Sequence, residues 1–267
     1  MASSTRQALA SAKAALQPLL ANADLNFASE LFAVSGAIAS SAQLRNLLSD
    51  PSAEVEAKSG AVSAVFAKGV SAEVLGFVTS LVALRWSKGS DLVASLEQLG
   101  VHSVATIAAA KGNIAQVSND LFAFQQAIEG DSELQFALAA KSASAQARTA
   151  LVTKLLAGKA TAEGTVLIQQ AVVHAGKRRA SLVLEQFGKL VAQVASSLVA
   201  KVTVAQELSA AQLERLQAAL AKTYGAAIKV NIEHDASLIG GVRVQIADQI
   251  IDGSLASRLN QARLSLA

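Results

Sequence analysis

The residues that could support catalysis or metal binding are few and lie far apart in the sequence. The chain holds three histidines, His102, His174 and His234, and no cysteine. Helical metal sites usually place their ligands at Glu-x-x-His or His-x-x-x-His spacing, and neither spacing occurs here. The sequence therefore predicts no catalytic residue, no metal site and no cofactor. The histidines are expected in solvent or at the edge of the core.

Two adjacent glycines, Gly240 and Gly241, raise the question of a phosphate-binding loop. Such loops add a third glycine at a fixed spacing, or a lysine followed by serine or threonine, so that backbone amides face the phosphate. Neither addition follows here. A turn into a strand explains the pair better, because glycine adopts backbone angles that other residues avoid.

Charged residues form only short clusters. Lys177-Arg178-Arg179 stands at an expected helix start and is interpreted as a solvated turn, with contact to anionic lipid as the alternative. Glu54 and Glu56 stand at another helix start, where negative charge compensates the helix dipole without acid–base chemistry. The net charge is +3, from 23 basic and 20 acidic residues that are interspersed. This pattern argues against a nucleic-acid-binding face.

The composition indicates tightly packed helices. Of the 267 residues, 52% are hydrophobic and 4% aromatic, and there are two prolines. Alanine and leucine favour helix, and small side chains let helices approach closely. Mean hydropathy is +0.40, yet the apolar run Leu31–Leu44 is shorter than the ~20 residues that span a bilayer. The amphipathic start of the chain shows no signal-peptide pattern.

The sequence contains an internal repeat. Leu31-Phe32-Ala33 matches Leu121-Phe122-Ala123, an offset of 90 residues (121 − 31). Towards the end of the repeat the offset slips to 88 (184 − 96), where Leu96-Glu97-Gln98-Leu99-Gly100 matches Leu184-Glu185-Gln186-Phe187-Gly188. The repeat predicts two bundles of similar structure.

Apolar residues at helical spacing predict helices in both copies. They are expected at 3–20, 24–40, 43–48, 53–67, 71–86 and 89–109, and then at 113–129, 132–140, 144–157, 162–175 and 178–199. Asp50-Pro51-Ser52 marks a stop and a restart, with Asp50 or Ser52 as the next N-cap. After residue 199 the apolar period changes to two, which predicts strands at 202–204, 228–232 and 242–246 around a helix that starts at Ser209.

The expected fold is therefore mainly α, with two tandem helical bundles followed by a small α/β module. The expected boundaries are residues 1–110 for the first bundle, 111–198 for the second and 199–267 for the module. The module is expected to end in a hairpin and a last helix, which Asp252-Gly253-Ser254 would cap.

The helix expected at 71–86 has an unusually wide apolar surface. At ~100° per residue its apolar side chains cover an arc of about 180°, whereas a bundle helix needs only ~100°. The second copy is less apolar at these positions. We therefore expect a partner helix to bind the first bundle through Leu9, Leu16, Phe77 and Leu81. The alternative is that both wide faces are simply core.

The C-terminal segment carries an ordered string of residues. Residues 237–244 read Ser-Leu-Ile-Gly-Gly-Val-Arg-Val, and Asp252-Gly253-Ser254 and Arg258-Leu259 follow. This string resembles the signature of the delta, or oligomycin-sensitivity-conferring, subunits of F-type ATP synthases, over roughly residues 199–267. Two features depart from that family: Ala247 replaces a usual glycine, and the helical bundle is duplicated, as in long actinobacterial forms.

The resemblance implies a stator part of the peripheral stalk that is not an enzyme. Its N-terminal bundle would hold the N-terminal segments of alpha subunits in the catalytic head. Its C-terminal module would hold membrane-anchored b-type stalk subunits, so that proton translocation stays coupled to ATP synthesis. The implied location is the cytoplasmic face of the bacterial cell membrane, bound only through the complex. Two rival interpretations are a general helical-repeat scaffold for peptides, which would not need the signature, and an enzyme, which would need a convergent polar site.

Overall fold

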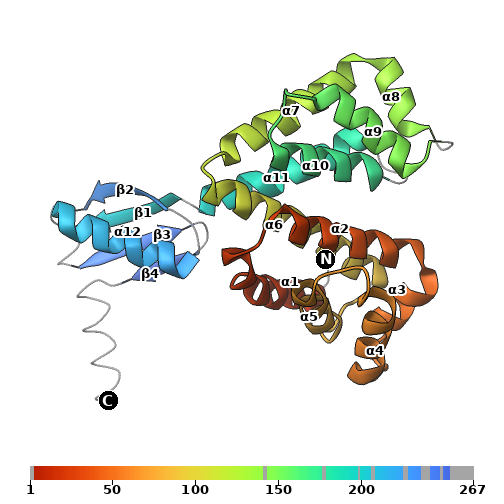
Figure 1. Cartoon of the computed structure of the whole chain (residues 1–267). Coiled ribbons are helices and arrows are strands. Elements are labelled where there is room, and N and C mark those ends of the chain that lie inside the picture. The colour runs from red at the N-terminus through yellow and green to blue at the C-terminus, as the bar shows by residue number, and fades with distance from the viewer. Residues whose placement is uncertain are drawn as a thin grey trace. The chain divides into compact units, whose positions relative to one another are not determined.

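The structure is a computed structural model that describes residues 3–140, 143–175, 179–197, 199–205, 208–224, 228–235, 241–246 and 249–252. The chain divides into two compact units, Met1–Val191 and Ala192–Ala267. The first is helical and the second is a mixed α/β module (Figure 1). The expected fold class is confirmed: two tandem helical bundles precede a small α/β module.

Six α-helices and one 3-10 turn build the first bundle among the described residues. They are α1 (Ser3–Leu16), η1 (Leu19–Ala21), α2 (Leu25–Ser40), α3 (Ala42–Ser49), α4 (Val55–Phe66), α5 (Ala72–Val82) and α6 (Gly89–Ala110). The second bundle continues with α7 (Ile114–Gly130), α8 (Ser132–Ala139), α9 (Ala145–Leu156), α10 (Ala162–Val173) and α11 (Ala180–Ser197). Both bundles lie in the first compact unit, and α11 runs from it into the second.

The duplication is visible in the helix boundaries. Adding 90 to the bounds of α3 and α4 gives 132–139 and 145–156, which are the bounds of α8 and α9. The same shift places α1 at 93–106, inside α6. Correspondingly, α1 packs against α5 and α6, and α6 packs against α10. Helix α6 therefore ends the first bundle and also serves as the first helix of the second.

Several predicted boundaries need correction. The first helix ends at Leu16, not at residue 20, because a residue before proline avoids the helical region and Pro18 lies two positions on. The fifth ends at Val82, not at 86. Asp50 and Ser52 are not N-caps: α4 starts at Val55. Asp50 instead closes a turn, in which its Oδ1 accepts a hydrogen bond from the amide of Ser52 at 2.8 Å.

Helix α6 is the one helix of the described residues that is long and apolar enough to cross a membrane by length and composition. Its 22 residues are mostly covered by protein, with 67% of its most apolar window buried. Packing in two bundles at once explains the composition, because a helix that is apolar on all sides is normally a core helix.

The two bundles meet at a joint centred on Phe32 of α2. The Phe32 ring stacks on Phe187 of α11, with ring centroids 6.4 Å apart. A Cβ atom added to Gly100 of α6 would lie 2.8 Å from Phe32 Cε1, so only glycine permits this approach. Nearby, Gly36 of α2 lies against the imidazole of His174 at the end of α10. The joint binds the bundles into one packed body.

The α/β module is a four-stranded sheet with one described helix. Strand β1 (Val199–Val204) pairs in parallel with β2 (Lys229–His234) and antiparallel with β3 (Val242–Ile246), which pairs with β4 (Gln249–Asp252). The strand order is β2-β1-β3-β4. Helix α12 (Ala210–Tyr224) packs Leu216 and Leu220 on the sheet core. Ser209 starts it: Ser209 and Gln212 bond each other's backbone amides at 3.3 and 2.9 Å.

Candidate functional site

The structure places the predicted partner-binding residues inside the first bundle. Leu16, Phe77 and Leu81 are buried, with exposed fractions of 0%, 4% and 1%. Leu9 is half-buried and packs on the same core. Three of these four side chains therefore stabilise the bundle, and only Leu9 reaches its outer edge. Whether a partner binds there stays a prediction.

Polar contacts fix α1 against the start of α6. Thr5 of α1 is fully buried, and its Oγ1 donates to Asp91 Oδ2 at 2.8 Å and accepts from the amide of Ser87 at 3.3 Å. Trp86 is buried, and its Nε1 donates to the Leu81 carbonyl at 2.9 Å. These bonds hold α1 against the connection between α5 and α6 and against the start of α6, and α1 also packs on α5.

Each bundle contains a carboxylate clamp that sequence reasoning missed. In the first, Glu30 Oε2 accepts from the amide and the hydroxyl of Ser71, at 2.8 and 2.7 Å. In the second, Asp120 Oδ2 accepts from the amide and the hydroxyl of Thr161, also at 2.8 and 2.7 Å. Both pairs are related by the offset of 90 and join the second helix of a bundle to the N-cap of its fifth. The signal available in the sequence was that an acidic residue, Glu30 or Asp120, and a hydroxyl residue, Ser71 or Thr161, recur at the repeat offset of 90.

The second bundle adds an ion pair with no counterpart in the first. Glu163, at the start of α10, is 2% exposed and accepts from Lys111 Nζ at 2.7 Å and Asn113 Nδ2 at 3.1 Å. Burial disfavours the charged form, but the hydrogen bonds from Lys111, its own backbone and Asn113 outweigh that effect and lower the pKa of Glu163. The contact ties the end of α6 to the start of α10.

The histidines stand on three different elements. Burial, aided by the positive charge of Lys13, lowers the pKa of His102 on α6 to about 4. This imidazole is therefore neutral at physiological pH. His174 lies at the joint between the bundles and His234 ends β2. Among the described residues, no three histidine, aspartate or glutamate side chains come together as a metal-binding group.

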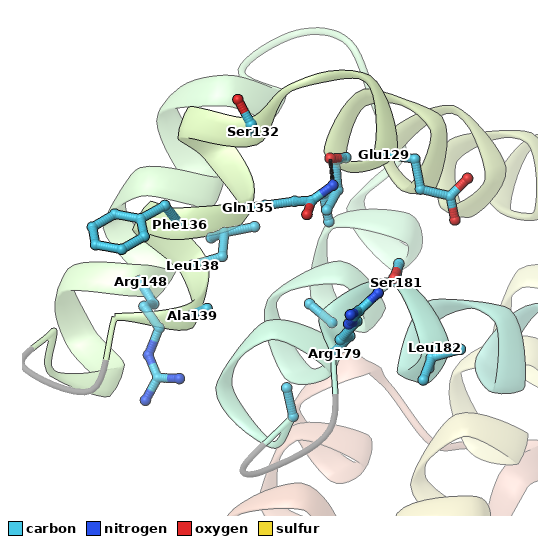
Figure 2. Close-up of a pocket in the computed structure, with 13 residues that line it drawn as sticks. Glu129, Ser132, Gln135, Phe136, Leu138, Ala139, Arg148, Arg179, Ser181 and Leu182 are labelled. Carbon is cyan, nitrogen blue, oxygen red and sulfur yellow. Dashed lines mark hydrogen bonds between the residues drawn. The ribbon is translucent and has the colours of Figure 1, made fainter.

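A cavity with a volume of about 960 Å³ lies in the second bundle. It is lined by α7 and α8 on one side, by Arg148 of α9, and by the residues at the start of α11. Figure 2 shows Phe136 and Arg148 on one side of the opening, with Arg179 and Leu182 on the other. Phe136 is 78% exposed. The lining thus combines exposed apolar surface with two guanidinium groups.

Few of the signature residues lie within the described part of the chain. Gly241 precedes β3 and has a φ of 88°, a backbone angle that favours glycine and agrees with the predicted turn into a strand. Asp252 is the last residue of β4. Gly240, Gly253, Ser254, Arg258 and Leu259 lie outside the described residues, as does the predicted last helix.

Comparison with known proteins gives a consistent result. The family described as ATP synthase delta (OSCP) subunit matches residues 101–266, from within α6 almost to the end of the chain. Proteins named ATP synthase subunit delta are 38% identical in Pseudarthrobacter chlorophenolicus (over 275 residues) and 39% in Leifsonia xyli subspecies xyli (over 267 residues). The relative in Streptomyces griseus subspecies griseus is 36% identical over 270 residues. Each alignment covers 100% of both chains.

Among solved structures, a chain of the Toxoplasma gondii mitochondrial ATP synthase hexamer aligns with 17% identity. The alignment covers 62% of this chain and 96% of that one, with a TM-score of 0.29. A TM-score of this size does not establish a common arrangement.

Proposed function

The chain belongs to the ATP synthase delta (OSCP) subunit family, and on that basis we propose that it is a non-catalytic stator part of the peripheral stalk. It links the catalytic head to membrane-anchored b-type subunits at the cytoplasmic face of the membrane. The link prevents the head from turning with the rotor, so that proton translocation drives ATP synthesis. Several modest contacts used together give a firm hold, because linked sites raise the effective concentration.

The observation that carries this proposal is the division of the family-matched chain into two compact units. A linker between two machines needs two separate binding surfaces, and each unit here has its own core. We assign the helical unit to the head and the α/β module to the stalk. The assignment follows the family resemblance of the module and the apolar surface of the first bundle.

The proposed head-binding surface is the outer edge of the α1–α5 pair. Leu9 and Leu75 are half-buried there, at the margin of the first core. Buried Leu16, Phe77 and Leu81 support this edge from within. An amphipathic N-terminal segment of an alpha subunit would lie along it, with its apolar face on the two leucines.

Reconstitution tests the function. Membranes containing ATP synthase without this subunit are expected to hydrolyse ATP but to pump few protons, because head and stalk are uncoupled. Adding the whole purified chain should restore ATP-driven proton pumping, measured by quenching of a pH-sensitive dye. If pumping is full without the chain, the stator assignment is wrong.

A matched pair of substitutions tests the surface. Leu9→Glu should weaken binding of a synthetic alpha N-terminal peptide in calorimetry. Leu47→Glu on α3 adds the same charge to the same bundle at a residue that is already 39% exposed, and should not. Equal effects would exclude the α1–α5 edge. Leu81 is unsuitable as a probe, because a charge at its buried position would unfold the bundle.

A further inference from the structure

The two copies of the repeat hold the same pair of residues in different environments. In the first bundle, Phe32 of α2 lies so close to Gly100 of α6 that an added Cβ would meet its ring at 2.8 Å. At the offsets of 90 and 88, the second bundle has Phe122 on α7 and Gly188 on α11. Phe122 is 62% exposed, and a Cβ added to Gly188 would have no atom of the described residues within 4 Å. The second pair is therefore not in contact.

The cavity of the second bundle separates α7 from α11 beside this pair. Its lining includes Glu129 at the end of α7 and Leu182 at the start of α11, and Figure 2 shows Glu129 above the space and Leu182 below it. Phe122 and Gly188 lie about two turns further along the two helices. In the first bundle the equivalent helices, α2 and α6, are in contact. The second bundle is thus open on the side on which the first is closed.

The open arrangement explains neither residue of the second pair. An exposed phenylalanine leaves a large apolar ring in water, and no other side chain of that size is exposed on α7. A glycine inside a helix weakens that helix and is expected where another group approaches the backbone closely. Both residues have a role if α7 and α11 also come together, because the ring then covers the glycine.

We propose that the second bundle also adopts a closed arrangement, in which α11 packs on α7 as α6 packs on α2. Phe122 then lies on Gly188 and reproduces the contact seen in the first bundle. The closed arrangement shields the Phe122 ring from water in the free chain and narrows the cavity. The inference uses the repeat alone and does not depend on the stator function.

Phe187 couples this closure to the joint between the bundles. In the open arrangement its ring stacks on Phe32, with centroids 6.4 Å apart. At the offset of 88 its equivalent is Leu99, which is 0% exposed in the core of the first bundle. In the closed arrangement Phe187 takes the corresponding place in the second bundle and leaves Phe32. Closing exchanges the aromatic stack for burial of Phe122, and this balance keeps both arrangements accessible.

Disulfide trapping detects the closed arrangement. The chain has no cysteine, so Phe122→Cys together with Gly188→Cys introduces the only two thiols. The control pair is Phe122→Cys with Lys189→Cys, because the Lys189 side chain is 72% exposed and points ~100° away from Gly188 around the helix. Under mild oxidation of the whole chain, the first pair should form an intrachain disulfide at least about 10-fold faster, since the bond requires Cα atoms within about 7 Å. Equal rates, or disulfides formed only between chains, would overturn the proposal.

Fluorine NMR measures closure without new thiols. Para-fluorophenylalanine in place of Phe122 should give one exposed and one buried resonance, in proportions that do not change with protein concentration. Gly188→Leu should abolish the buried resonance, because its side chain occupies the place of the ring, whereas Gly60→Leu on α4, also in open space, should not. Phe187→Leu removes the stack of the joint and should raise the ratio of closed to open chains about 2- to 10-fold, the factor that an aromatic pair contributes.

The outcomes of the fluorine measurement are decisive in both directions. A single exposed resonance that Phe187→Leu leaves unchanged would show that the bundle stays open, and a buried resonance that survives Gly188→Leu would show that α11 is not what covers the ring. Loss of the buried resonance in Gly188→Leu alone supports the closed arrangement. Circular dichroism of each variant confirms that the helices remain folded.

Discussion

Replacing Gly100 with alanine tests the joint between the two bundles. Gly100 lies in the middle of α6, where an added Cβ would meet Phe32 Cε1, Cζ and Cδ1 at 2.8, 2.9 and 3.1 Å. The Phe32 ring is fully buried and stacked on Phe187, so it has little room to move away. The substitution therefore forces either the two rings or the two bundles apart.

The magnitude comes from two opposing effects. Overpacking a close-packed core costs about 1–3 kcal/mol. Alanine in place of glycine in a helix interior stabilises by about 1 kcal/mol. Gly100→Ala should therefore lower the free energy of unfolding by between about 0 and 2 kcal/mol. Gly188, the equivalent residue of the second copy, has no atom within 4 Å of an added Cβ. Gly188→Ala should raise the free energy of unfolding by about 0.5–1 kcal/mol. Because the gain from replacing glycine applies to both variants, their free energies of unfolding should differ by the overpacking cost of about 1–3 kcal/mol.

Urea unfolding measures this difference. Trp86 is the only tryptophan of the chain and lies buried in the first bundle, so its fluorescence follows that bundle, while circular dichroism follows all helices. A double variant, Gly100→Ala with Phe32→Leu, should recover part of the loss because the smaller side chain makes room. Equal stabilisation by Gly100→Ala and Gly188→Ala would show that the joint is loose and the reasoning wrong.

Three further predictions concern other parts of the chain. Gly164→Ala should destabilise the second bundle by about 1–3 kcal/mol in urea unfolding, since its Cβ would lie 2.6 Å from Asp120 Oδ2, whereas Gly76→Ala in open space on α5 should not. Below its ordinary pKa of about 6.5, His102 takes up a proton more readily in the unfolded chain than in the folded one, where its pKa is about 4. The free energy of unfolding should therefore decrease as the pH is lowered from about 6.5 to about 4, by at most about 3 kcal/mol. The variant His102→Gln should show a flatter dependence of stability on pH in this range. Removing residues 254–267 should leave head binding intact but release the b-type subunits and reduce proton pumping at unchanged ATP hydrolysis; release from the head with stalk binding preserved would reverse the assignment of the two units.

The repeat made the helices predictable. Apolar residues at helical spacing placed the helices of both copies within a few residues, the repeat related the two sets, and the change to a period of two located the sheet. The repeat offset does not predict how far each side chain is buried. Phe32 and Phe122 are the same residue of the repeat, yet they are 0% and 62% exposed, because only the first copy is covered by the other. Equivalent residues share a backbone position but not their neighbours.

The candidate sites were harder to predict for a related reason. The wide apolar arc of α5 could not separate a binding groove from a core, and three of the four residues chosen from it and from α1 are buried. One lining residue of the cavity in the second bundle is the small Ala180, and at the offset of 88 the first copy has the larger, buried Leu92. A difference of this size leaves the helical pattern intact, so it becomes visible only when both copies are folded and compared.

Sharing α6 between the bundles also constrains the length of that helix. Each residue of an α-helix advances the chain by 1.5 Å and turns it by about 100°. Inserting one residue at the middle of α6 would rotate the second bundle's contact face away from α10 while the first bundle kept its own. Insertions near a whole number of turns, such as seven residues, would nearly restore the phase and shift the second bundle by about 10 Å along the axis. The length of α6 therefore fixes how its contact face for the first bundle is rotated relative to its contact face for the second. In the course of evolution this length can change only by steps that preserve that rotation.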